Sequence, residues 1–67
     1  MQALTIKELG QMYFPNSTSK SAGAQLIRWI KFNQQLWLEL ANAGYRSGQR
    51  LMTPRQVSLI YQYLGEP

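Results

Sequence analysis

The chain of 67 residues contains no cysteine and no histidine. Disulfides, thiolate chemistry and the usual zinc sites are therefore excluded, because each of them needs one of these side chains. Aspartate is also missing, and only three glutamates supply negative charge. This set offers no acid–base pair, catalytic triad or metal cage, and no glycine-rich phosphate loop is present. We therefore expect no enzymatic activity and no cofactor.

Long apolar runs are absent as well. No stretch approaches the ~20 residues that a membrane-spanning helix needs. The first ten residues, MQALTIKELG, also lack the cationic start and apolar run of a secretory signal. We therefore expect a cytoplasmic protein with no membrane partner and no small-molecule substrate. The hydrophobic fraction of 45% suffices for one compact core, so we expect a single domain over residues 1–67.

Positive charge dominates what is present. Seven lysines and arginines face three glutamates, which gives a formal net charge of +4. No acid lies between residues 9 and 38 or between residues 40 and 65, and each of these windows holds three cations. Such clustering favours an anionic partner, of which nucleic acid is the first candidate.

Two capping boxes predict the first and the last helix. Thr5 is followed three residues later by Glu8, and Pro15 ends this first helix at the preceding residue. Thr53 and Gln56 repeat the pattern after the turn residues of positions 45–52, and a proline occupies the first helical position. The loop itself can extend toward its end and form a rudimentary wing.

Residues 18–31 predict the central helix, with Thr18 or Ser19 as its N-cap. Asn33 can end this helix and cap a third one over residues 34–43, although one unbroken helix over 19–43 is an alternative. The predicted fold is therefore all-α: a small four-helix, helix-turn-helix-like domain with a short loop or rudimentary wing before the last helix.

Helical spacing predicts which side chains form the core. In the central helix the apolar arc comprises Ala22, Leu26, Trp29 and Ile30, and in the third helix it comprises Leu36, Trp37, Leu40 and Ala41. Gly10 interrupts the first helix at a cost of about 1 kcal/mol relative to alanine. Close approach of the small Ala22-Gly23 pair explains this cost.

The opposite side of the central helix carries Lys20, Ser21, Gln25, Arg28 and Lys31. Arginine can bond guanine at two atoms and glutamine can do the same for adenine, so Arg28 and Gln25 are the candidates for base contacts. Lys20 and Lys31 suit less directional contacts with phosphates. An ordinary solvated helix face would show the same pattern.

Lys7 and Arg55 both occupy the second position of a predicted helix, where a cation opposes the helix dipole. An arriving phosphate would reverse this cost, because free amides, dipole and side chain would converge on it. The alternative is that both side chains simply extend into water. The predicted nucleic-acid-binding residues are thus Lys7, Lys20, Ser21, Gln25, Arg28, Lys31 and Arg55.

Four segments together resemble a known family: IKELGQMYFPNSTSKSA, QLIRWIKFNQQL, AGYRSGQR and MTPRQVSLIYQYLGEP. The chain resembles, from Thr5 to Pro67, a family of short proteins from gut Bacteroidales that is classified only as a domain of unknown function. The resemblance implies a small, mostly helical cytoplasmic protein of helix-turn-helix character. It implies no activity and assigns no functional residue. Many relatives have proline where this chain has Ser19.

Two functions compete. The first is duplex DNA binding, as a transcriptional or mobile-element accessory protein, with the helix at 18–31 in the major groove and a homodimer or a protein partner completing the complex. The second is a protein-interaction adaptor that uses exposed apolar residues, namely Ile27, Phe32, Leu38 and Leu59. RNA or single strands rank third, through stacking on Phe32 and the tyrosines.

Overall fold

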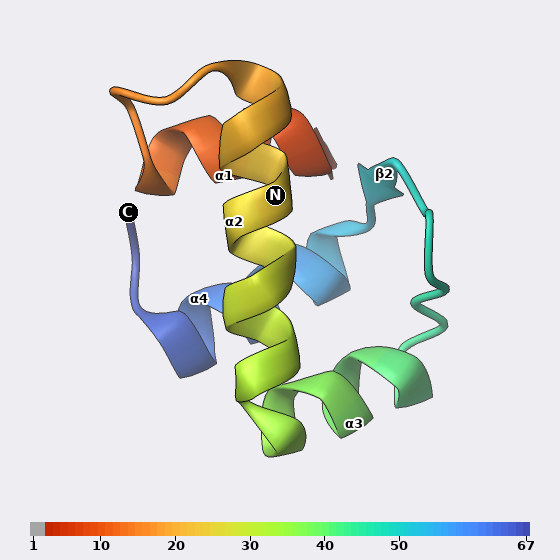
Figure 1. The fold of residues 1–67 in the computed structure, drawn as a ribbon. Helices are drawn as coiled ribbons and strands as arrows, with labels where there is room; N and C mark the ends of the chain where they lie inside the picture. The colour runs from red at the N-terminus through yellow and green to blue at the C-terminus, as the bar shows by residue number, and fades with distance from the viewer. Residues whose placement is uncertain (1–2) are drawn as a thin grey trace.

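The structure is a computed structural model that describes residues 3–67. Its elements follow the order β1 (Leu4–Thr5), α1 (Ile6–Tyr13), α2 (Ser19–Phe32), α3 (Gln34–Asn42), β2 (Leu51–Met52) and α4 (Pro54–Leu64). Helix α2 stands in front of α1 and α4 in Figure 1, and α3 crosses its lower end. The all-α, four-helix prediction is confirmed.

Both predicted capping boxes are present. The Thr5 hydroxyl accepts the Glu8 amide proton at 3.1 Å, and the Glu8 carboxylate accepts from the Thr5 amide at 3.0 Å. The amide of Thr5, and then its hydroxyl, hold the pKa of the Glu8 carboxyl below its ordinary value. Thr53 and Gln56 exchange the same two bonds at 3.3 and 3.0 Å. These reciprocal bonds fix the first turns of α1 and α4.

The break between α2 and α3 lies at Asn33, whose φ of −94° and ψ of 94° leave the helical region. Its side-chain oxygen accepts from the Leu36 amide at 3.1 Å and caps α3. The prediction of two helices is therefore confirmed, and the alternative of one helix over 19–43 is wrong. Thr18, rather than Ser19, is the N-cap of α2, because its hydroxyl accepts from the Ser21 amide at 3.2 Å.

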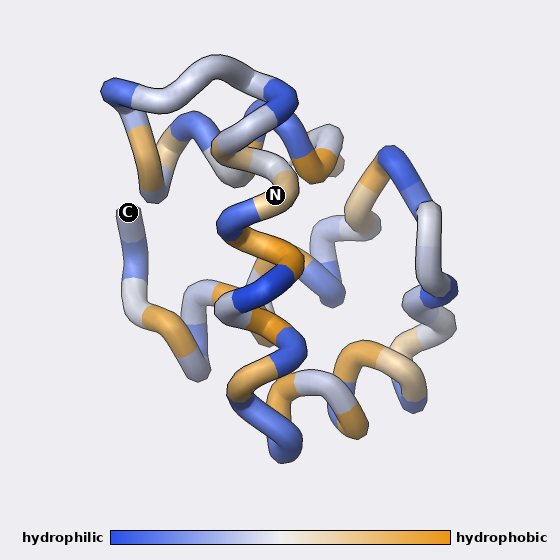
Figure 2. Tube along the Cα trace, in the orientation of Figure 1, coloured by the Kyte–Doolittle hydropathy of each residue, from blue (hydrophilic) through white to orange (hydrophobic). Residues whose placement is uncertain are grey.

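Side chains from all four helices, the loop and β2 form one core. Its buried apolar members are Leu9, Leu26, Ile30, Leu36, Leu40, Tyr45, Met52, Val57 and Ile60. Figure 2 shows apolar and polar positions alternating along α2 and α3, as helices with one buried side require. Ala41 is exposed, contrary to prediction, because the buried line of α3 is narrow and contains only Leu36 and Leu40.

The two short strands pair antiparallel, with Leu4 opposite Met52 and Thr5 opposite Leu51. The Ile6 amide extends this ladder by donating to the Arg50 carbonyl at 2.7 Å. The loop before α4 thus contributes one strand that pairs with the beginning of the chain, not a two-stranded hairpin of its own. This pairing attaches the loop before α4 to the beginning of α1.

The end of the chain is attached to α1. The Tyr13 hydroxyl donates a hydrogen bond to the carbonyl oxygen of Gly65, just after α4. Partial burial, and then the proximity of Tyr61 and Glu66, raise the pKa of Tyr13 to about 12. The phenol therefore stays protonated and able to donate throughout the physiological range.

Helices α1 and α2 cross in close contact at Gly10. A Cβ atom added to Gly10 would lie 2.6 Å from the carbonyl carbon and oxygen of Ala22 and 2.8 Å from the Gly23 nitrogen. No side chain fits at such distances, and the contacted atoms are backbone that cannot move aside. The predicted reason for Gly10 is confirmed: its missing side chain lets the two helices touch.

Two glycine substitutions test this crossing. Gly10→Ala should lower the free energy of unfolding by about 1–3 kcal/mol, because the clash outweighs the better helix propensity of alanine. Gly23→Ala is the matched control, because its added Cβ would meet Lys7 Cγ at an ordinary 3.6 Å. It should leave stability equal or raise it by up to about 1 kcal/mol. Urea denaturation measures both, and a Gly10→Ala protein as stable as the parent would contradict the assigned crossing.

Candidate nucleic-acid interface

Helix α2 has one buried side and one exposed side. Ala22, Gly23, Leu26 and Ile30 are buried against the core. We call the exposed side the outer face of α2; it comprises Lys20, Ser21, Ala24, Arg28, Lys31 and Phe32, with the half-buried Gln25 at its edge. At about 100° per residue, Arg28 lies opposite the midpoint between Leu26 and Ile30 and so occupies the centre of this face.

Gln25 is partly engaged within the protein. Its Nε2 donates to the Ser17 hydroxyl at 3.0 Å and to the Ser21 hydroxyl at 3.2 Å. The first bond attaches the turn before α2 to the helix, and Gln11 supports the same turn by donating to the Ser17 carbonyl at 2.9 Å. Bonding adenine at two atoms requires an Nε2 proton, so Gln25 would have to release one of these partners to read a base.

The lysines frame the outer face of α2. Lys20 is exposed at its N-terminal end. The Lys31 ammonium lies 5.8 Å from the centroid of the Trp37 ring, so a cation–π contact directs it toward α3. Lys7 of α1 lies beside Gly23, where its stem is within van der Waals reach of an added Cβ. The structure therefore brings Lys7 next to α2, but beside its buried Gly23 and not onto the outer face.

Arg55 is not part of this arrangement. It is exposed at the second position of α4, which lies behind α2 in Figure 1. Of the seven predicted residues, six thus lie on or beside α2 and one is separate. Sequence reasoning left two exposed cations, Arg46 and Arg50, out of the predicted set. The sequence RSGQR places these two arginines on either side of the turn-forming Ser47-Gly48, and this spacing could have indicated a cationic loop.

Trp29 was predicted to belong to the core, and this is wrong. The side chain is 45% exposed. Its ring makes edge-on contacts with Phe14, at 4.7 Å between centroids, and with Tyr13, at 6.3 Å. Trp29 lies on the flank of α2, where Tyr13 at the end of α1 and the following Phe14 cover part of it and the rest is in contact with solvent.

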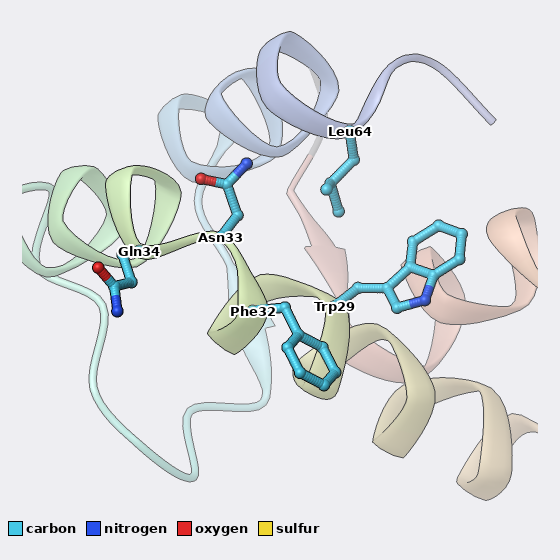
Figure 3. A pocket seen from close by; sticks show the side chains of 5 residues that line it. All are labelled: Trp29, Phe32, Asn33, Gln34 and Leu64. Carbon is cyan, nitrogen blue, oxygen red and sulfur yellow. The ribbon is translucent and has the colours of Figure 1, made fainter.

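Phe32 is the most exposed large apolar side chain among the described residues, at 84%. Shallow hollows surround it: one is lined by Trp29, Asn33, Gln34 and Leu64, and others by Gln25, Arg28, Trp29 and Lys31. Figure 3 shows Leu64 extending from the end of α4 toward Trp29, while Gln34 points away. The lower part of the outer face of α2 therefore combines an aromatic ring with two cations.

Metal clusters and membrane-spanning helices were also sought in residues 3–67. No group of three or more acidic, histidine or cysteine side chains in this part of the chain could hold a metal ion. Among the described helices, none has both the length and the apolar character to cross a bilayer.

The structure defines a small all-α domain whose longest helix presents a cationic face. The chain belongs to the family described as Domain of unknown function (DUF4248), whose model matches residues 1–67. The resemblance predicted from the sequence is therefore confirmed at the level of a domain-of-unknown-function family. No curated protein and no solved structure matches the chain.

Neighbouring substitutions in α2 test the assignment of its sides. Arg28→Ala should change the free energy of unfolding by less than about 0.5 kcal/mol, because the side chain is exposed. Trp29→Ala should lower it by about 1–2 kcal/mol, through the loss of two aromatic contacts on a half-exposed ring. Thermal melts of both proteins provide the measurement. A loss at Trp29 of the size expected for a core aromatic, about 3–5 kcal/mol, would show that the ring is buried after all.

Proposed function

We propose that this chain is a duplex-DNA-binding module that places the outer face of α2 in the major groove. The observation that supports this most is the composition of that face. Lys20, Arg28 and Lys31 are exposed on it, and no acid occurs between residues 9 and 38. A polyanion therefore meets only attractive charge along the whole helix.

The shape of α2 suits this partner. Its 14 residues give a rod of about 21 Å, and the major groove of B-DNA, about 12 Å wide, admits one α-helix. The buried side chains Leu26 and Ile30 hold the rod on the core, so the outer face approaches DNA as a rigid unit. In this arrangement Arg28 contacts a base edge at the centre, and Lys20 and Lys31, toward the two ends of the helix, contact phosphates.

The biological setting forms part of the same proposal. We assign the chain helix-turn-helix character, a cytoplasmic location in gut Bacteroidales, and a role as a transcriptional or mobile-element accessory protein. A single module of this size covers about 600–1,000 Å² of protein surface on DNA, which is small for tight specific binding. A symmetric homodimer or a separate protein partner would supply the remaining contact area.

A salt titration on random duplex DNA tests the proposal. About four to six phosphate contacts predict that log affinity falls against log salt with a slope of roughly −4 to −5. Arg28→Ala should weaken binding by about 1–3 kcal/mol and, if it also touches a phosphate, reduce the slope by about 1. Gln35→Ala, an exposed change on α3, is the control and should bind like the parent. Undetectable binding at low salt, or an affinity independent of salt, would refute the DNA proposal.

A protein-interaction adaptor is the second candidate, and the exposure of Phe32 favours it. Of the apolar residues predicted for this role, Phe32 and Leu38 are exposed, whereas Ile27 and Leu59 are half-buried and pack on the core. The adaptor surface would therefore centre on Phe32, with Trp29 and Leu64 beside it.

The two candidates respond differently to Phe32→Ser. This change should leave the fold intact, because the ring is almost entirely in solvent. An adaptor would lose cross-linked protein partners in cells on Phe32→Ser and keep them on Arg28→Ala. A DNA-binding module would lose affinity for duplex DNA on Arg28→Ala, so a combined cross-linking and titration experiment separates the two.

A further inference from the structure

Residues 44–50, which we call the arginine loop, connect α3 to β2, and hydrogen bonds hold their backbone at several points. The Arg46 amide donates to the Gln49 side-chain oxygen at 3.2 Å, and the Gln49 amide donates back to the Arg46 carbonyl at 3.0 Å. The Arg50 carbonyl accepts from the Ile6 amide at 2.7 Å. Gly44 and Gly48 supply positive φ angles of 87° and 86°, which the turns require.

Gln56 anchors this loop from inside the protein. Its side chain is 1% exposed, so burying its amide would be costly without hydrogen bonds. The Nε2 donates to the Ala43 carbonyl at 3.1 Å, and the Oε1 accepts from the Thr53 amide at 3.0 Å and from Gln49 Nε2 at 2.7 Å. Gln56 therefore joins the end of α3, the arginine loop and the start of α4.

Gln49 adds further hydrogen bonds to those of Gln56, and we call the two side chains together the glutamine clamp. Gln49 Nε2 also donates to the Leu51 carbonyl at 2.6 Å, while its Oε1 holds Arg46. A capping box alone needs only the bond between Gln56 and Thr53, so the further bonds serve the loop. The side chains of Arg46 and Arg50 nevertheless lie exposed. A fixed backbone with exposed cations is the arrangement of a preorganised binding loop, since little conformational entropy is lost when a ligand arrives.

The positive charge of the arginine loop favours an anionic partner, and its small tip fits a narrow groove. Arg46 and Arg50 flank a tip whose residues are Ser47 and Gly48, and no acid lies between residues 40 and 65. A tip this small can approach the floor of the DNA minor groove, which is about 6 Å wide. Narrow A·T-rich minor grooves carry enhanced negative potential and attract arginine.

We propose that the arginine loop contacts the minor groove next to the major groove that α2 occupies, and that Gln49 and Gln56 position it there. Adjacent grooves of B-DNA lie about half a helical turn, ~17 Å, apart. The protein measures 30 × 24 × 22 Å, so each of its dimensions exceeds that separation. The loop lies to one side of α2 in Figure 1. The inference depends on the DNA-binding function proposed above.

Inosine substitution tests the loop separately from α2. Replacing guanine by inosine removes the amino group from the minor groove and leaves the major-groove edge unchanged, so only a minor-groove contact should respond. The parent should bind alternating inosine–cytosine duplex more tightly than guanine–cytosine duplex, by up to about tenfold, the order expected for an arginine contact. A minor-groove ligand such as netropsin should compete with the protein on A·T-rich duplex.

Substitutions in the arginine loop test whether the loop causes the preference for inosine-containing DNA. Arg46→Ala and Arg50→Ala should each reduce the preference for inosine-containing DNA. Gln49→Ala keeps both arginines but releases Arg46 and Leu51, so it should reduce the preference and leave the salt slope unchanged. A purely structural role of Gln49 would instead alter stability without altering the preference. Gln62→Ala, an exposed change on α4, is the control and should behave like the parent.

Each remaining outcome overturns one part of the proposal. If Arg46→Ala and Arg50→Ala lower only the salt slope, and both polymers bind equally, the loop contacts phosphates and the minor-groove inference is wrong. If these variants bind normally while Arg28→Ala weakens binding, α2 acts without the loop. If the parent binds no duplex at low salt, both the function and the loop inference are wrong.

Discussion

The close crossing of α1 and α2 determines which side of α2 faces outward. Gly10 meets the backbone of Ala22 and Gly23, so the two helices cannot rotate about their axes without a clash or a gap. This contact places Leu26 and Ile30 in the core and leaves Arg28 facing solvent. A backbone contact, not an electrostatic one, therefore gives the cationic face its direction.

Hydrogen bonds of polar side chains connect separate segments of this domain, as disulfides or metals do in many small domains. Gln56 is buried yet satisfied by three partners from three segments, and Asn33 connects α2 to α3 by capping. Among the described residues, no buried side-chain polar atom is left without a partner. A domain of 67 residues has a small hydrophobic core. Fully hydrogen-bonded polar side chains therefore help to fix a single conformation of the segments that connect its helices.

Local signals in the sequence predicted the local structure well. The caps Thr5 and Thr53 and the reason for Gly10 were identified from spacing and residue type. Thr18 as a cap and the break at Asn33 were each one of two alternatives that the sequence left open. Periodicity also identified the polar side of α2. Three features were not predictable: the bonds of Gln25 to the preceding turn, the exposure of Trp29 and the hydrogen bonds of Gln49. Each depends on how segments that are distant in the sequence pack against one another.

The pairing of β1 with β2 has a consequence for the order of folding. Leu4 and Met52 lie 48 positions apart, whereas α1 and α2 are neighbours in the sequence. Contacts between distant segments form late, because closing a long loop costs entropy before any contact compensates. The α1–α2 pair can therefore form early, while the Arg50 carbonyl gains its hydrogen bond from the Ile6 amide only when β1 pairs with β2. Hydrogen exchange at the Ile6 amide would report this late step.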